Sequence, residues 1–397
     1  MNFATTKKLG EVCEIVGGGT PSTAVSKYWD GDIVWVTPKD LGHFKDIEIT
    51  NSSKKITEEG LKKSSAKLLP KGTVVLSSRA PIGYVAIAGI QLATNQGCRS
   101  FICGKDLYNK YLYYFLKNST KILQAGGSGS TFSEISGSRL KEIEIPVPGI
   151  EVQKRIVGRV EELMTKIDEA KRLRAEAQED TKNLLPAALH QIFSQAKQKN
   201  WQEKELEQVC EQITDGTHNV PPYEPRGIPM VDTKNMDDDF TVDVSHATKF
   251  ISQETDRLLS KRCKPKQDDI LISSRGTIGK IAIVTQGQDF NIMGNIILMR
   301  PDKNLLPKFL ANFLKHVVID INSIAWGTSQ KGLYLNKMRK YKIPIPSLSE
   351  QKKIVGYLDS LSEKTRQIQA LQAETAQDFK DLEQSILHKA FSGELVK

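Results

Sequence analysis

The sequence predicts an α+β protein made of two related globular parts and two long helices. Three observations predict this class: an internal duplication, short β-like runs between turn residues, and two heptad stretches. The segment LSSRAPIG at residues 76–83 returns as ISSRGTIG at residues 272–279, and IPVP at residues 145–148 returns as IPIP at residues 343–346. Because the repeat is roughly 200 residues long, each copy is large enough to be a domain and is far longer than a solenoid repeat.

The first globular part is expected over residues 1–148 and the second over residues 199–346. In the first, β-like runs at residues 33–36, 73–76 and 85–87 lie among Gly, Pro, Ser and Asn, which punctuate strands. A helix is expected over residues 109–118. The order of motifs in the second copy predicts the same mixed architecture.

Long helices are expected over residues 149–198 and 347–397. Apolar residues in each stretch recur at alternating steps of three and four, which is the heptad seam of a coiled coil. The seam of the first comprises Ile156, Val160, Leu163, Ile167, Ala170, Ala177, Leu184 and Ala188. That of the second comprises Ile354, Leu358, Leu361, Thr365, Ile368, Thr375, Phe379, Leu382 and Ile386. Since polar residues interrupt both seams, we expect the two helices to pair as an antiparallel coiled coil.

The net charge of +9 fits either a protein that meets a polyanion or simple solubility. The positive excess lies mainly on the first globular part, because its helix carries equal numbers of acidic and basic residues. The five cysteines include no Cys-x-x-Cys pair, which disfavours a disulfide framework and a zinc site. No apolar run is long enough to span a bilayer, and no secretory start is present, so we expect a cytoplasmic protein with no membrane partner.

The order of these motifs resembles that in a known family. The segments GTP at 19–21, WVTPKDL at 35–41, LPKG at 69–72 and TNQG at 94–97 surround the first SSRAPIG motif, and DGTH at 215–218 precedes the second copy of that motif. Together with the IPVP and IPIP segments, they are similar to the target recognition domains of type I restriction-modification specificity subunits. The resemblance covers nearly the whole chain and implies two such domains joined by the helices.

The resemblance implies a non-catalytic, DNA-binding subunit. Each domain would read one half of an asymmetric bipartite target in double-stranded DNA, and the helices would fix the nonspecific spacer. Two methylation subunits and the restriction subunits would be its partners. Those partners would hold S-adenosylmethionine, ATP and Mg²⁺, whereas this chain would bind no cofactor or metal and contribute no catalytic residue.

Residues at matching positions of the two copies are the candidates for DNA contact. Arg79 and Arg275 follow Ser-Ser pairs at strand ends, where a guanidinium could reach a base edge, a phosphate or only its own loop. The full set is Gly19, Thr20, Lys39, Arg79, Ser130, Thr217, His218, Lys234, Arg275, Ser329 and Gln330. The glycine-containing loops in this set could also be simple turns.

Six seam residues are further predicted to bind the partner subunits: Ile156, Val160, Leu163, Ile354, Leu358 and Leu361. Two other functions stay open from the residues alone. The chain could be a solitary DNA-binding scaffold, or a DNA methyltransferase that acts without partners. The segment NVPPY at residues 219–223 comes near a base-holding motif of amino-methyltransferases, but its inserted valine breaks the match, and no glycine-rich cofactor motif accompanies it.

Overall fold

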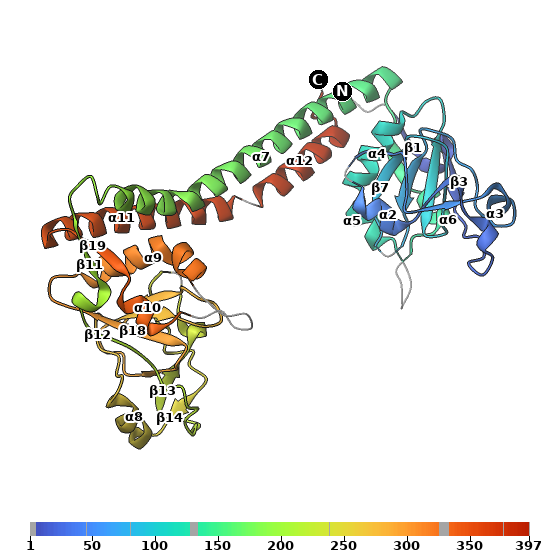
Figure 1. Cartoon of the computed structure of the whole chain (residues 1–397). Helices are drawn as coiled ribbons and strands as arrows, with labels where there is room; N and C mark the ends of the chain where they lie inside the picture. The colour runs from blue at the N-terminus through green and yellow to red at the C-terminus, as the bar shows by residue number, and fades with distance from the viewer. Residues whose placement is uncertain are drawn as a thin grey trace. The chain divides into compact units, whose positions relative to one another are not determined.

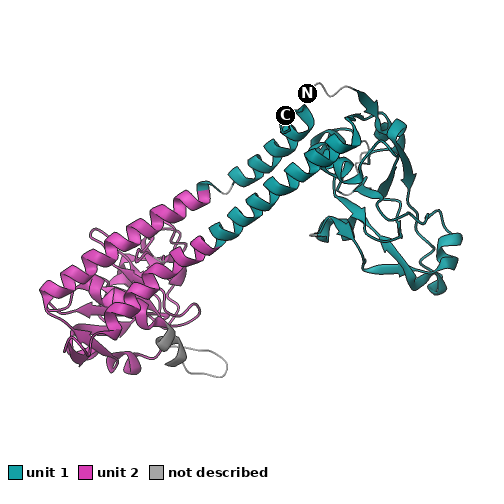
Figure 2. Ribbon diagram, turned by 90° about the horizontal axis from the view of Figure 1, so that it is seen from above, with its two compact units in different colours: residues 1–175, 374–397 teal, residues 176–373 magenta. Residues whose placement is uncertain are grey.

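A computed structural model gives the fold for residues 5–44, 46–79, 81–127, 134–237, 239–324, 333–375 and 377–396. The chain divides into two compact units (Figure 2). Unit 1 consists of Met1–Ala175 together with Glu374–Lys397, and unit 2 consists of Glu176–Ala373. Each unit therefore contains one globular part and segments from both long helical stretches.

Unit 1 is built around a five-stranded sheet with the strand order β2-β9-β6-β7-β4. Its strands are β2 (Cys13–Gly17), β9 (Cys98–Cys103), β6 (Val74–Ser77), β7 (Val85–Ala88) and β4 (Glu48–Ile49). A second sheet has the order β5-β3-β8, and β1 pairs with β10. These strands are β5 (Lys54–Ile56), β3 (Trp29–Val36), β8 (Leu92–Thr94), β1 (Thr6–Lys8) and β10 (Glu144–Pro146). The central strand β6 is an unbroken apolar run ending in serine, and all four of its residues are buried.

The sheet of unit 1 is covered by α4, which packs on β6 and β7 (Figure 1). This helix occupies Asn109–Asn118, as the sequence predicts, and buries Tyr111, Leu112, Phe115 and Leu116. The other helices are α1 (Leu9–Val12), α2 (Pro38–His43), α3 (Glu58–Lys62), α5 (Thr120–Ala125), α6 (Gly137–Lys141) and the 3₁₀ turn η1 (Ser26–Tyr28).

Unit 2 repeats this architecture, which confirms the predicted pair of α+β domains. Its main sheet has the order β12-β18-β15-β16, and its second sheet the order β14-β13-β17. The strands are β11 (Gln202–Glu205), β12 (Cys210–Asp215), β13 (Ile228–Val231), β14 (Phe250–Ile251), β15 (Ile270–Ser273), β16 (Ile281–Ile283), β17 (Asn291–Ile292), β18 (Ile296–Pro301) and β19 (Lys342–Ile345). The helices are η2 (Leu206–Gln208), η3 (Thr233–Asn235), α8 (Gln253–Ser260), α9 (Pro307–Ile324) and α10 (Leu335–Arg339).

The two long helical stretches differ in continuity. The first is one helix, α7 (Ile150–Ser194), although it contains Pro186. The second is two helices, α11 (Leu348–Glu374) and α12 (Asp378–Ser392), so the predicted single helix over residues 347–397 is wrong. Asp378 and Asp381 lie in the first turn of α12, where carboxylates stabilise the positive end of a helix.

Within each unit the helices pack antiparallel, as predicted. In unit 1, Lys171 of α7 forms an ion pair with Glu383 of α12, and the Arg174 guanidinium lies 5.8 Å from the centre of the Phe379 ring. In unit 2, Gln372 of α11 donates a 3.5 Å hydrogen bond to Thr181 of α7. In unit 1 the later residue on α7 thus contacts the earlier residue on α12, as antiparallel helices require.

The predicted seam is right near the globular parts and wrong in the middle. Ile156, Val160 and Ile167 are buried in the core of unit 1, and Ile354 and Leu358 are buried in that of unit 2. After Arg174 the match is partial: Thr181 and Ala188 lie at predicted seam positions and are buried, whereas Ala177 and Leu184 are exposed and Leu185 packs on the core in place of Leu184. Ile368, Thr375 and Leu382 are also exposed. An α-helix has 3.6 residues per turn, so a strict seven-residue pattern drifts around an unsupercoiled helix.

Candidate nucleic-acid interface

Loop residues 95–97 lie at the centre of a cluster of loops in unit 1. The Ser78 N–H donates to the carbonyl of Gly97 over 2.8 Å, and the Ser78 hydroxyl donates to the same oxygen over 3.1 Å. The Asn95 N–H donates to the Val36 carbonyl over 3.0 Å, and the Gly19 N–H donates to the Thr94 carbonyl over 2.8 Å. Segments that are far apart in the sequence therefore meet at one place.

The predicted residues Gly19, Thr20, Lys39 and Arg79 all lie around this loop. The Thr20 hydroxyl donates a hydrogen bond to the Gln96 side chain. A β-carbon on Gly97 would lie 2.9 Å from Pro38 Cγ and 3.2 Å from Arg79 Nε, so glycine is what permits this close approach. The side chain of Lys39, next to Pro38, is exposed.

Lys39 is held in place by the start of helix α2. The Thr37 side chain caps the helix, and the Thr37 backbone N–H donates to the Asp40 carboxylate over 2.9 Å. Burial alone would raise the pKa of the Asp40 carboxyl, but hydrogen bonds from Ser53 and Thr37 outweigh it and hold the pKa below its ordinary value. Asp40 is therefore an ionised cap, and the ammonium of Lys39 is left facing solvent.

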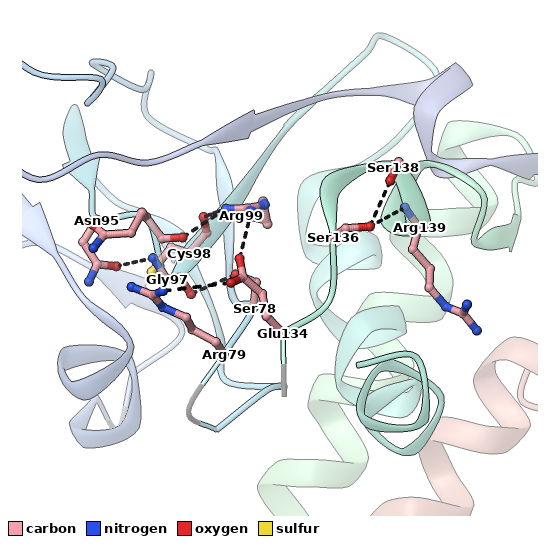
Figure 3. Close-up of polar contacts among 11 residues, drawn as sticks. Ser78, Arg79, Asn95, Gly97, Cys98, Arg99, Glu134, Ser136, Ser138 and Arg139 are labelled. Carbon is pink, nitrogen blue, oxygen red and sulfur yellow. Dashed lines mark hydrogen bonds and ion pairs between the residues drawn. The ribbon is translucent and has the colours of Figure 1, made fainter. Parts of the chain in front are cut away.

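Arg79 belongs to a charged group that Figure 3 shows in detail. Glu134 accepts a 3.0 Å hydrogen bond from Arg99, and its other carboxylate oxygen lies 3.9 Å from the Arg79 guanidinium. The Arg99 side chain is 20% exposed and that of Arg79 is 36% exposed. Two guanidiniums thus share one carboxylate, and the group keeps a net positive charge at the surface.

The same pattern of backbone hydrogen bonds, called the loop frame below, recurs in unit 2 around residues 293–295. The Ser274 N–H donates to the Asn295 carbonyl over 2.7 Å, and the Leu333 N–H donates to the Ser274 carbonyl over 2.8 Å. The corresponding bonds of unit 1 run from Ser78 to Gly97 and from Ile135 to Ser78. The frame is shared even though the side chains that it carries differ.

The side chains of this second cluster are differently paired. His218 Nε2 lies 2.7 Å from one Asp215 carboxylate oxygen, and Arg262 binds the other oxygen. A β-carbon on Gly294 would lie 2.6 Å from His218 Nδ1, so the imidazole sits directly on the central loop. Arg275 is exposed on the turn after β15.

Thr217 and Lys234 also lie at this cluster. The Gly294 N–H donates to the Thr217 carbonyl over 2.7 Å, and the Thr217 hydroxyl donates to the Asn219 carbonyl over 2.9 Å. The Lys234 side chain is exposed, while its N–H is capped by Asp232 over 2.8 Å. The predicted candidates thus gather in two clusters, one in each unit.

The remaining predicted residues lie elsewhere. Ser130, Ser329 and Gln330 are outside the described residues. Ile156, Val160, Leu163, Ile354, Leu358 and Leu361, which are predicted to bind partner subunits, pack into the cores of their own units. Their side chains therefore have a structural role within the chain, and a role in subunit binding stays a prediction.

Arg99 and Glu134 are the residues that the sequence reasoning missed. In β9 the side chains of Cys98 and Ser100 are buried, so alternation turns Arg99 to the opposite face. That alternation was a usable signal for Arg99. Ile297 occupies the corresponding place in unit 2, because Arg99 pairs with Gly17 across the sheet as Ile297 pairs with Asp215.

The described residues include no group of three or more His, Cys, Asp or Glu side chains that could hold a metal ion. Nor does any helix of the described chain have the length and apolarity needed to cross a membrane. The side chains of the two clusters offer hydrogen bonds and positive charge. Both suit phosphate oxygens and base edges.

Comparisons with known proteins show the family to which the chain belongs. The chain is 49% identical over 152 residues to the type I restriction enzyme MjaIX specificity subunit of Methanocaldococcus jannaschii, a match over 38% of this chain and 35% of that protein. The chain thus matches about a third of the length of this relative.

Solved structures match over nearly the whole chain. The HsdS subunit from Thermoanaerobacter tengcongensis superposes with a TM-score of 0.68 at 25% identity, covering 98% of this chain and 97% of that one. A chain from a study of complex assembly and conformational transition of the type I R-M system has the same fold, with a TM-score of 0.70 at 24% identity over 98% of both chains.

The family model for the type I restriction modification DNA specificity domain matches twice, at residues 3–179 and 198–375. Each match begins with a globular part and runs into the helical stretch that follows. This protein belongs to the type I restriction modification DNA specificity domain family.

Proposed function

We propose that the chain is the DNA-recognition subunit of a type I restriction-modification complex. Unit 1 and unit 2 each read one part of a bipartite target in double-stranded DNA. The observation that carries the proposal is the duplicated loop frame, which presents different side chains in the two units. One frame with two sets of contacts suits an asymmetric target.

The helical stretches serve as the spacer in this proposal. Within each unit, α7 packs antiparallel on α11 or α12, and both helices are anchored in the core of that unit. A helix gains about 1.5 Å per residue, so α7 is long enough to set a fixed distance between two contact points on DNA. Paired helices are stiff, which a fixed nonspecific spacer requires.

Catalysis and cofactors belong to the partners in this proposal. Two methylation subunits would supply S-adenosylmethionine, and restriction subunits would supply ATP and Mg²⁺ chemistry, while this chain would bind the DNA and hold the assembly. The complex would act in the cytoplasm. A chain with the same fold comes from a study of complex assembly in the type I R-M system, which supports partners of this kind.

Genome-wide methylation mapping with and without the gene for this chain tests the proposal. We expect one asymmetric, gapped motif to lose its methylation when the chain is absent. An unchanged methylome, with the methylation subunits still present, would reject the proposal. Methyl transfer by the isolated chain would instead favour a methyltransferase that acts without partners.

A further inference from the structure

Unit 2 contains a basic cavity beside its loop cluster. The cavity has a volume of about 500 Å³ and lies between the helices α7 and α11 and the globular part. Its charged lining residues are Lys182, Lys280, Lys315, Arg366 and Asp239. Four cations and one carboxylate give the cavity an excess of positive charge that would attract an anion.

One wall of the cavity continues the turn that carries Arg275. Gly279 and Lys280 follow Arg275 in this turn and line the cavity. The Gly279 N–H donates to the Ser273 carbonyl over 3.0 Å, and the Lys280 N–H donates to the Ser273 hydroxyl over 2.8 Å. These two hydrogen bonds hold the backbone of the turn against the end of β15. The cavity therefore extends from the candidate DNA contacts to the spacer helices.

Three of the cations around the cavity, Lys182, Lys280 and Arg366, have contacts that leave much of their charge available. Lys280 Nζ donates to the Met236 carbonyl over 2.9 Å, a contact that orients the ammonium without neutralising it. Lys182 lies 3.7 Å from Glu179, and Arg366 lies 3.6 Å from Glu363. Such long, exposed pairs between residues one turn apart are weak and are easily replaced by a phosphate.

The corresponding place in unit 1 is bridged. There, Gln384 of α12 donates a 3.1 Å hydrogen bond to Asn118 at the end of α4. When the two copies are aligned, Gln384 corresponds to Pro186 and Asn118 corresponds to His316 of unit 2. Proline has no side-chain hydrogen-bond donor, so Pro186 cannot form this bridge. The His316 ring stacks on Phe193 with 5.3 Å between ring centres.

The charges also differ between the two places. Lys280 and Arg366 of unit 2 correspond to Tyr84 and Asp168 of unit 1. The other two cations, Lys182 and Lys315, correspond to Lys380 and Lys117 of unit 1. Only Lys280 and Arg366 are therefore particular to unit 2, and they increase the positive charge of its cavity.

We propose that this cavity binds phosphate groups of the DNA backbone in the nonspecific spacer, next to the half-site contacted by unit 2. The proposal rests on the proposed function. A free nucleotide shares the phosphate chemistry but would need a surface for its base. Phe240 is the one aromatic side chain among the described lining residues, and Lys315 Nζ already lies over its ring, 5.1 Å from the centre.

The first test compares charge removal in the two units. In the full chain, Lys182→Gln with Arg366→Gln removes two cations from exposed positions of the helices of unit 2. Lys380→Gln with Lys117→Gln is the matched control in unit 1. Binding to a duplex with the mapped target is measured by fluorescence anisotropy across a series of KCl concentrations.

We expect the slope of log K against log salt to fall by about 0.9 for each lost phosphate contact in the unit 2 variant, and to stay unchanged in the control. Base preference should be the same in all three proteins. Equal slopes for the wild type and the unit 2 variant would overturn the proposal, as would the same loss of slope in the control.

The second test locates the contact on the DNA. Single methylphosphonate groups, which are uncharged, are placed along one strand of the target duplex. They should weaken wild-type binding at spacer positions beside the half-site of unit 2, and weaken binding by the unit 2 variant much less. Equal sensitivity of both proteins at every position would overturn the proposal.

Three further outcomes separate this proposal from its alternatives. Inorganic pyrophosphate binding, measured by calorimetry, that is lost in the unit 2 variant while its DNA salt slope is unchanged would identify a small-anion site and overturn the assignment to DNA. A wild-type chain without preference for the mapped target would reject the proposed function itself. A wild type that prefers the target, beside a variant that behaves identically, would reject the cavity proposal alone.

Discussion

Glu134 sets the charge of the loop cluster in unit 1. It binds Arg99 closely and lies at the edge of ion-pair distance from Arg79. In unit 2, Ile297 replaces Arg99, and Arg275 is exposed. Two arginines therefore share one carboxylate in unit 1, whereas in unit 2 Arg275 is exposed and Arg262 is paired with Asp215.

Replacing the Glu134 carboxylate should loosen the first cluster. In Glu134→Gln, both arginines keep their charge but lose their anionic partner, so they can reach any nearby phosphate. We expect tighter binding to random duplex DNA and weaker discrimination in one half-site only, measured by anisotropy on a panel of duplexes. A lower melting temperature with unchanged discrimination would instead give Glu134 a purely structural role.

Alanine at Arg79 or Arg275 separates base reading from phosphate binding. If an arginine contacts a base edge, its loss should cost about 1–3 kcal/mol and relax one position of one half-site. If it holds a phosphate, all sequences should bind more weakly and the salt slope should fall by about one unit. Binding curves at two salt concentrations distinguish these results, and unaltered binding by both variants would remove the arginines from the interface.

The helix α7 shows how an element departs from its sequence pattern. Its first half follows the predicted seam, because Ile156, Val160 and Ile167 enter the core of unit 1. Its second half turns Leu185 inward and leaves Leu184 42% exposed. The predicted pattern thus holds at Thr181 and Ala188 and is displaced by one residue between them, from Leu184 to Leu185.

This displacement predicts unequal effects of two neighbouring substitutions. Leu185→Ala removes a side chain packed on the core of unit 2 and should destabilise the protein by about 1–2 kcal/mol, somewhat less than full burial of a leucine is worth. Leu184→Ala should change the stability by less than about 0.5 kcal/mol, as exposed substitutions do. Chemical denaturation of both variants measures the difference. A larger loss of unfolding free energy for Leu184→Ala would support the predicted seam instead.

Shortening both helical stretches tests their role as a spacer. In unit 1, Arg174 of α7 lies against Phe379 of α12. Deleting residues 174–180 together with residues 373–379 removes seven residues from each helical stretch and keeps the anchoring cores. We expect the methylated motif to keep both half-sites across a shorter gap. A gap of the original length would show that the helices do not set it.

At the level of the whole molecule, the duplication made most of the fold predictable. The sequence predicts three features because each depends on local pattern and burial: the apolar run of β6, the bounds of α4 and the anchoring ends of the seams. The division between α11 and α12 was not, since no Gly or Pro marks residues 375–377. The contact between Arg99 and Glu134 joins residues 35 positions apart, so it needs the folded sheet to be seen.

Exchange of one globular part should alter one half of the target. The two units have separate cores, so residues 1–145 can be replaced by the same segment of a related subunit without repacking unit 2. We expect methylation mapping to show one new half-site and one unchanged half-site. A change in both halves would mean that the two clusters act together.

The division of the chain into units has a consequence for biosynthesis. Unit 2 is contiguous, whereas the core of unit 1 includes Ile386, Leu387 and Ala390, which leave the ribosome after all of unit 2. The nascent chain can therefore complete unit 2 before unit 1, although unit 1 begins first. A translation product that stops after residue 373 would expose the apolar face around Ile156 and Val160, and it would be a substrate for chaperones and proteases.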